Sequence, residues 1–224
     1  MRRQAEVSRP VVKGTLMPMP MGLPPPVPGF EMFVASHGMS EGLSQTTGAQ
    51  IIPRVTLRMG DVQLGAQWRN ISSPIASGIA ALFIKWSRRS ENSQVELAAL
   101  YRVRTDAPAG VDRKAWEFDA GFRHSFGTVG LRAIAEYSPK EFEAGQSLYV
   151  EVGPTLQIAK TTMISLNAGQ RERGGAPDYS TFNAGVTHLV GRKLSLDARV
   201  YATDHPERGS RYRTRLVVSA RVIL

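Results

Sequence analysis

The sequence predicts an all-β protein, a single up-and-down antiparallel transmembrane β-barrel of about 12 strands. From residue 49 to the C-terminus apolar and polar residues alternate, and in eleven segments the apolar row carries no formal charge. Trp116, Phe118 and Phe122, for example, alternate with Glu117 and Asp119. Successive side chains of a strand point to opposite faces, so this period of two indicates strands. One apolar and one charged face on every strand are typical of a barrel that stands in lipid around a polar interior.

We expect twelve strands, and an even number is usual in single-chain bacterial outer-membrane barrels. The segments have about the length of a tilted membrane strand, which needs ~9–11 residues. The longest run with few polar residues, 75–84, is too short for a membrane-spanning helix, which needs about 20. The expected strands cover residues 30–39, 49–59, 62–70, 77–87, 93–103, 114–124, 129–138, 146–158, 161–170, 179–189, 193–202 and 210–224.

The connections between these strands alternate in length. Long connections cover residues 40–48, 71–75, 104–113, 139–145, 171–178 and 203–209. Short ones cover residues 60–61, 88–92, 125–128, 159–160 and 190–192. Outer-membrane barrels have short periplasmic turns and longer outer loops. The pattern therefore predicts a bacterial outer-membrane location with both termini in the periplasm.

Composition adds further limits. Of the 14 prolines seven lie in residues 1–29, so we expect a Pro/Met-rich flexible extension there and the barrel in residues 30–224. No apolar core of a signal peptide follows Arg2 and Arg3, which leaves the export route open. The absence of cysteine excludes disulfides and thiolate metal sites. The net charge of +9 comes from arginines spread along the strands, so nucleic acid is not an expected partner.

Large aromatic residues on the apolar row gather near the predicted strand ends. Rings with a polar edge prefer the lipid–water boundary, and membrane barrels carry girdles of them. Six would lie near the long loops and two near the short turns, which favours girdles that contact outer-membrane lipid. The expected girdle residues are Trp68, Tyr101, Trp116, Tyr137, Phe182 and Tyr212 at one level, and Trp86 and Phe122 at the other.

The charged row must face the lumen if the strands span a membrane. A single Arg or Lys on the lipid face costs ~2–4 kcal/mol at mid-membrane, and thirteen would exceed a domain's stability of ~5–15 kcal/mol. Arg104, Arg211 and Arg221 belong to this row. The sixteen residues that we expect to line a pore are Arg54, Arg58, Arg69, Lys85, Glu96, Arg102, Glu117, Asp119, Arg123, Arg132, Glu136, Glu151, Asp197, Arg199, Arg213 and Arg215.

Two segments carry a family resemblance. Residues 41–46 read Glu-Gly-Leu-Ser-Gln-Thr, and residues 62–70 read Val-Gln-Leu-Gly-Ala-Gln-Trp-Arg-Asn. They resemble the Arg-Gly-Ile/Val-Ser-Gln-Ser/Thr signature and the strand ending in Trp-x-Asn of the TorF-like porin family. Residues 116–121, 133–139, 147–153 and 178–180 extend the similarity over 31–224, although Glu41 stands where the family has Arg. The resemblance implies a bacterial outer-membrane barrel with a porin role, and it supplies no catalytic residues.

We expect no enzymatic activity. Ser36 and His37 are adjacent, and neighbours in a strand point to opposite faces. Glu117 and Asp119 share a face as acid–base partners would, but the nearby Arg123 favours ion pairs instead. No metal or phosphate motif appears, so no cofactor and no metal is expected.

The leading functional hypothesis is a channel for the passive diffusion of small solutes. Thirteen basic and six acidic lumen residues predict weak anion selectivity, with Arg199, Arg213 and Arg215 as a basic ladder near Arg211. The alternative is a plugged or narrow structural or binding barrel, in which charged walls meet across the lumen. The solute and the oligomeric state stay open.

Overall fold

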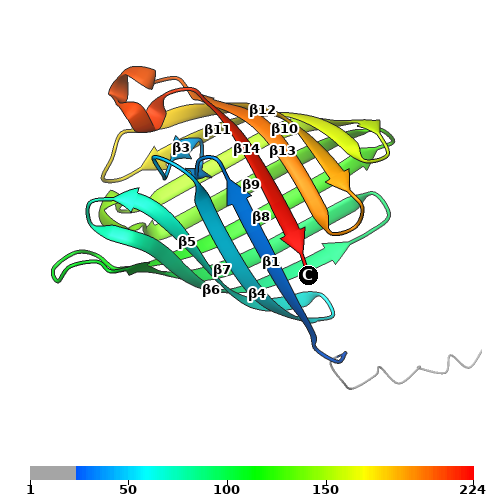
Figure 1. Cartoon of the computed structure of the whole chain (residues 1–224), viewed down its shortest axis with the longest axis horizontal. Coiled ribbons are helices and arrows are strands. Elements are labelled where there is room, and N and C mark those ends of the chain that lie inside the picture. The colour runs from blue at the N-terminus through cyan, green and yellow to red at the C-terminus, as the bar shows by residue number, and fades with distance from the viewer. Residues whose placement is uncertain (1–23) are drawn as a thin grey trace, which may run out of the picture.

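The structure, a computed structural model, describes residues 24–224, which form a closed barrel of twelve antiparallel strands (Figure 1). The predicted fold class is confirmed. Most of the expected N-terminal extension lies outside the described residues. The barrel strands are β1 (Val27–Ala35), β4 (Gln50–Met59), β5 (Val62–Ser73), β6 (Ala76–Arg89), β7 (Ser93–Thr105), β8 (Lys114–Phe126), β9 (Val129–Lys140), β10 (Ser147–Ala159), β11 (Thr162–Arg173), β12 (Tyr179–Val190), β13 (Leu194–Thr203) and β14 (Arg215–Ile223).

Each strand pairs with its neighbour along the chain, and the first closes on the last. Phe33 of β1 lies opposite Arg221 of β14, and the Leu224 amide donates to the Phe30 carbonyl at 2.9 Å. Both ends of the described chain therefore lie at one end of the barrel (Figure 1). Closure leaves no edge strand with unpaired backbone groups.

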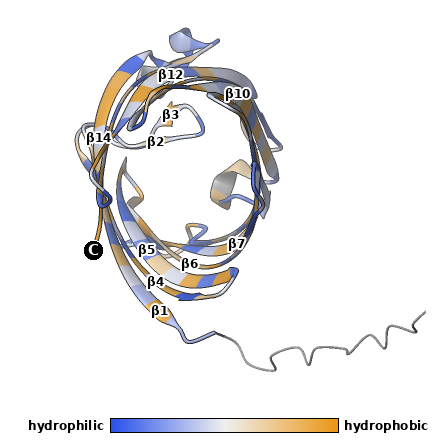
Figure 2. Cartoon of the chain, turned by 90° about the vertical axis from the view of Figure 1, so that its right-hand side faces the viewer, coloured by the Kyte–Doolittle hydropathy of each residue, from blue (hydrophilic) through white to orange (hydrophobic). Residues whose placement is uncertain are grey.

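The two faces of the sheet differ as the alternation predicts. Leu82, Leu166 and Leu216 on the outer face are 62%, 55% and 64% exposed, whereas Arg102 and Glu117 on the inner face are 5% and 7% exposed. Apolar and polar bands alternate along the ribbons in Figure 2. The barrel thus has an apolar exterior and a charged interior, the reverse of an ordinary soluble core.

Several connections differ from the prediction in length. Strands β5 and β6 extend further than expected, so their long-loop connection is only Pro74-Ile75 and the alternation of lengths is not strict. Strand β14 begins at Arg215 rather than residue 210, because the short 3-10 turns η2 (Pro206–Arg208) and η3 (Ser210–Tyr212) precede it. None of the helical segments within residues 24–224 is long or apolar enough to cross a membrane.

The connection between β1 and β4 turns into the barrel instead of outward. It carries a small hairpin of β2 (Met39–Ser40) and β3 (Leu43–Ser44), which lies inside the ring of strands in Figure 2. The β9–β10 connection also turns inward: Phe142 of η1 (Phe142–Ala144) packs against Ile79 and Ala115 of the wall. These two segments occupy the long-loop end of the lumen.

Candidate functional site

The tip of the β2–β3 hairpin is a two-residue turn inside the lumen. Glu41 and Gly42 have φ values of 50° and 78°, as a tight hairpin turn with both central residues in the left-handed region requires. A Cβ on Gly42 would lie 2.4 Å from Cγ2 of Thr181 on β12, so only glycine fits there. Glu41 lacks that freedom, and a non-glycine residue in this conformation persists where its surroundings hold it.

Arg171 of β11 holds Glu41. Arg171 is 2% exposed, and its Nη1 lies 2.8 Å from Oε2 of Glu41. Its Nη2 donates to Oε2 of Glu141 in the β9–β10 connection and, at 3.2 Å, to Oγ of Ser147. The planar fork of one guanidinium thus joins two inward segments to the wall.

The Glu141 carboxyl lies outside the strands, and the contact with Arg171 shifts its pKa. Burial by itself raises the pKa of Glu141, but the positive charges of Arg171 and Arg102 outweigh burial and hold that pKa below its ordinary value. Glu141 is therefore ionised near neutral pH, and its bond to Arg171 is a charged one.

Further hydrogen bonds attach the backbone of the hairpin and its flanks to separate parts of the barrel. The Tyr179 hydroxyl donates to the Glu41 carbonyl at 3.1 Å, and Nε of Arg211 donates to the Ser44 carbonyl at 3.2 Å. The Ser72 amide at the end of β5 donates to the Gln45 carbonyl at 2.8 Å. These hydrogen bonds hold the hairpin inside the lumen, whereas the sequence predicted an outer loop here.

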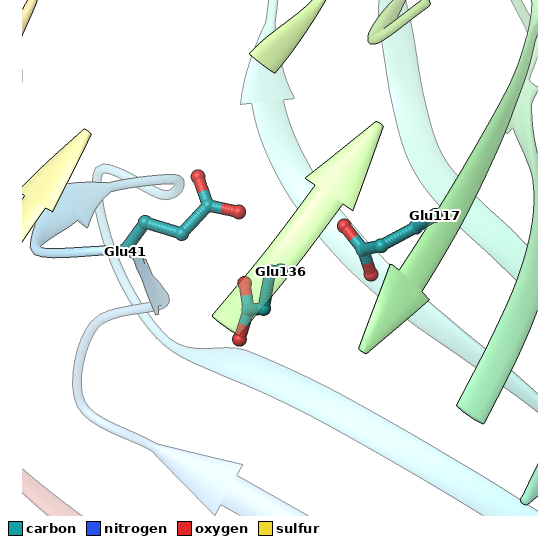
Figure 3. Close-up of side chains that lie close together, drawn as sticks. All are labelled: Glu41, Glu117 and Glu136. Carbon is teal, nitrogen blue, oxygen red and sulfur yellow. The ribbon is translucent and has the colours of Figure 1, made fainter. Parts of the chain in front are cut away.

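The opposite side of the tip faces two more carboxyl groups. Glu41, Glu117 of β8 and Glu136 of β9 each bring a carboxyl oxygen within 4.8 Å of the others (Figure 3). We call these three residues the acidic trio. Arg102 pairs with Glu117, as Arg171 does with Glu41. These arginines already supply positive charge to two of the three groups, so the cluster alone assigns no metal or cofactor.

Three cavities lie in the lumen around the hairpin. One of about 200 Å³ is lined by His37 and Met39 of the hairpin connection together with Arg54 and Arg221 of the wall. The long-loop cavity, about 430 Å³, is lined by Arg69, Arg102 and Arg171 among others. The short-turn cavity, about 600 Å³, is lined by residues of the opposite end such as Arg132 and Ser195. Glu41 lines both of these larger cavities, so the hairpin tip lies between them, whereas the smallest cavity shares Arg69 with the long-loop cavity and Met39 with the short-turn cavity.

One wall of the short-turn cavity is a continuous polar network. Glu151 of β10 accepts hydrogen bonds from Arg132 at 2.5 Å, from Tyr149 at 2.9 Å and from Asn183 at 2.7 Å. Asn183 in turn accepts a hydrogen bond from Arg199 at 2.7 Å. Charged, hydroxyl and amide groups on four strands, β9, β10, β12 and β13, are thus joined in one hydrogen-bond network, in which the charge of Glu151 is balanced by Arg132.

The strand register places all the predicted pore-lining residues on the inner row except Arg213. Arg213 precedes β14 and is exposed. The expected basic ladder does not form. Arg199 lies opposite Val217 and pairs with Asp197 at 3.2 Å, whereas Arg215 donates to the Ser210 carbonyl at 2.9 Å.

The predicted girdle residues on strands lie on the outer row. Trp116 and Phe182 are 50% and 52% exposed, and the rings of Tyr101 and Trp116 pack 5.0 Å apart. Tyr212 differs because it belongs to η3 and not to β14. Its ring packs edge-on against Tyr179 at 5.5 Å, in the long-loop end of the structure. Tyr212 is thus a loop residue, and its prediction as a strand residue of the girdle is wrong.

Sequence reasoning missed Arg171, Glu141 and the inward role of Glu41. The predicted strand ended at residue 170, which left Arg171 in a loop. A signal was present, since Asn167, Gly169 and Arg171 have the same parity as inner-row residues. A strand extended by three residues, as in the structure, places Arg171 on that row.

Three solved structures of outer-membrane proteins share this architecture. A KdgM porin in complex with disordered oligogalacturonate has a TM-score of 0.60 at 8% identity, over 88% of this chain and 98% of that one. The NanC porin has a TM-score of 0.59 at 4% identity, over 87% and 98%. An outer membrane channel from Pseudomonas putida F1 has a TM-score of 0.51 at 10% identity, over 97% and 99%.

The chain has the porin barrel fold. No protein-family model and no curated protein matches its sequence. At these identities the likeness concerns the path of the chain, so the function has to be argued from the lumen.

Proposed function

We propose that the chain is a bacterial outer-membrane barrel that works as a porin-like channel for the passive diffusion of small solutes. The observation that carries this proposal is a closed sheet with an apolar exterior around a charged interior that holds several cavities. Membership of the TorF-like porin family, lipid as a partner and periplasmic termini belong to the same proposal. The absence of enzymatic activity is likewise part of this proposal.

Weak anion selectivity is the finer part of the proposal. Six arginines line the long-loop cavity together with Glu41 and Glu141, and rings of basic residues favour anions in a pore. One similar porin was solved with oligogalacturonate, an acidic sugar chain. Small anions are therefore the solutes that we expect to enter first. The six are Arg69, Arg102, Arg104, Arg171, Arg173 and Arg211.

The test is recording from the purified protein in planar lipid bilayers. Single-channel steps support the channel, and a reversal potential on the anion side in a KCl gradient supports the selectivity. Replacing Arg69 and Arg173 by Gln should move the reversal potential towards cations. The matched control is Arg208→Gln, a change at an outer-loop arginine that does not line the long-loop cavity. Equal reversal potentials of all three proteins would contradict the assigned role of the cavity.

The second candidate is a plugged structural or binding barrel. It is favoured by the inward hairpin and by Phe142, which narrow the long-loop end. Absence of conductance from folded protein, both for the full chain and for a chain without residues 1–23, which leaves strand β1 (Val27–Ala35) intact, would support this alternative over the channel.

A further inference from the structure

The smallest cavity lies beside the hairpin connection, along the wall formed by β1, β4 and β14. Ala35 of β1, Ile52 of β4 and Val217 of β14 line it, and no member of the acidic trio does. It shares Arg69 with the long-loop cavity, and it shares Arg221 with the short-turn cavity. These shared lining residues place the three cavities in series along this wall.

The direct way between the two larger cavities passes the hairpin tip instead. Glu41 lines both of them, and Glu117 and Glu136 bring carboxyl oxygens within 4.8 Å of its own. The arginines that reach this point already have partners, since Arg102 pairs with Glu117 and Arg171 with Glu41. An anion that took the direct way would therefore meet carboxyl oxygens beside guanidinium groups that are already paired, which is an unfavourable path for negative charge.

The acidic residues that line the smallest cavity are each paired with an arginine. Oε2 of Glu31 lies 3.5 Å from Nη1 of Arg54, and Oδ2 of Asp197 lies 3.2 Å from Nη2 of Arg199. Two opposite charges at such distances largely cancel each other's field further away. The carboxylates of this cavity are therefore only a weak obstacle to an anion.

Arg69 and Arg221 differ from these paired residues. Within residues 24–224, neither guanidinium group has a hydrogen bond or an ion pair. Arg69 is half-buried on β5, and the guanidinium of Arg221 lies over the ring of Phe33, 5.9 Å from its centroid. A guanidinium has five N–H donors and no acceptor, so both groups need water or an anion as a partner. One unpaired arginine thus stands where the smallest cavity meets each of the larger ones.

We propose that small anions cross the lumen through the smallest cavity, and that Arg69 and Arg221 bind them on the way. This proposal rests on the proposed channel function and adds the route and the class of solute. About 200 Å³ has room for a chloride ion or a small carboxylate with several waters, each of which takes ~30 Å³, but not for an oligosaccharide. Two successive sites that each bind weakly are what conduction requires.

The first experiment measures reversal potentials in planar bilayers under a KCl gradient. Arg221→Gln should lower the ratio of anion to cation permeability by up to about fivefold, the effect of one unit charge at contact distance in water, although Arg221 does not line the long-loop cavity. Arg69→Gln should lower it as well, and Arg208→Gln is again the matched control. A reversal potential of Arg221→Gln equal to that of the control would overturn the route and leave a channel whose selectivity comes from the long-loop cavity.

A second experiment obstructs the route itself. The chain has no cysteine, so a single thiol can be placed at will. Ile52 lines the smallest cavity and neither of the larger ones, whereas Thr155 lines the short-turn cavity alone. A small sulfonate-bearing methanethiosulfonate should reduce the chloride current several-fold in Ile52→Cys and much less in the control Thr155→Cys. Equal losses of current in the two variants would contradict the route.

A third readout does not require conductance. Folded Ile52→Cys protein in vesicles is treated with the sulfonate reagent or with its trimethylammonium counterpart, and the rates of modification are followed by mass. Val217→Cys, in the same cavity, serves if gel mobility shows that Ile52→Cys does not fold.

The ratio of the two rates should favour the sulfonate and fall when Arg69 or Arg221 is replaced by Gln, because both guanidinium groups attract the anionic reagent. A ratio that neither replacement changes would overturn the role of the two arginines. A ratio that falls in protein without conductance would support anion binding in the smallest cavity and contradict the channel.

Discussion

Replacing Arg171 by alanine tests most directly whether this residue holds the inward hairpin and the β9–β10 connection in place. Arg171, Glu41 and Glu141 have side chains that are only 2%, 9% and 18% exposed. Removing one partner of a buried ion pair costs roughly 3–5 kcal/mol, because the other charge is left without a partner. Here lumen water can hydrate the released carboxylates, so we expect the lower end, about 3 kcal/mol, against a total stability of ~5–15 kcal/mol.

The assay is equilibrium unfolding by urea in lipid vesicles, followed by tryptophan fluorescence and by the gel mobility of the folded barrel. Arg171→Lys keeps the charge but loses the fork that reaches both carboxylates, so about half of the loss should appear. Arg208→Ala is the control, because Arg208 is an exposed residue of the connection between β13 and β14. If Arg171→Ala and Arg208→Ala unfold at the same urea concentration, the assigned role of Arg171 is wrong.

A triple variant separates the unpaired charges from damage to the wall. In Arg171→Leu with Glu41→Gln and Glu141→Gln no buried charge is left alone. Replacing a whole buried ion cluster by neutral groups is often close to neutral in stability. We therefore expect this variant to recover most of the stability that Arg171→Ala loses. A triple variant as unstable as Arg171→Ala would show that packing of the arginine, and not its charge, holds the segments.

Three further predictions follow from single residues. Gly42→Ala brings a Cβ to 2.4 Å from Thr181 at a φ of 78°, so β12 should push the hairpin tip away, with a loss of roughly 1 kcal/mol or more in urea unfolding. The pKa of Glu141 in the folded protein lies below its ordinary value of 4.5. Its contribution to the free energy of unfolding is therefore complete above about pH 5 and is lost as the pH falls through the folded pKa. In Glu141→Gln the free energy of unfolding in urea should depend less on pH between about pH 3 and pH 6. Leu166, 55% exposed on β11, should tolerate Arg poorly, by ~2–4 kcal/mol if it faces lipid, and equal assembly of Leu166→Arg and wild type in vesicles would contradict that placement.

The strands and their faces could be predicted because their signal is local. A period of two needs only neighbouring residues, and one charged row on every strand decides which face is inside once a membrane is assumed. The strand predicted at 114–124 becomes β8, Lys114–Phe126, with Trp116 outside and Glu117 inside. Errors at such strand ends are small because turn residues mark them.

The inward position of the β2–β3 hairpin could not be predicted, because it depends on contacts between residues that are distant in the sequence. Residues 40–48 have the polar composition of an outer loop, and nothing within them indicates that Arg171, 130 positions after Glu41, holds the turn inside. Residues 210–214 show the opposite error. Their alternation continues that of β14, but the 3-10 turn η3 takes Tyr212 out of the sheet and places it against Tyr179.

Net charge is a poor guide to what such a lumen selects, since most of its charges lie beside an opposite one. Arg132 contacts Glu151, Arg199 contacts Asp197, and Lys85 lies near Glu96, so these residues contribute little field at the centre of the barrel. For the channel that we propose, the arginines gathered in the long-loop cavity are therefore residues whose replacement tests selectivity.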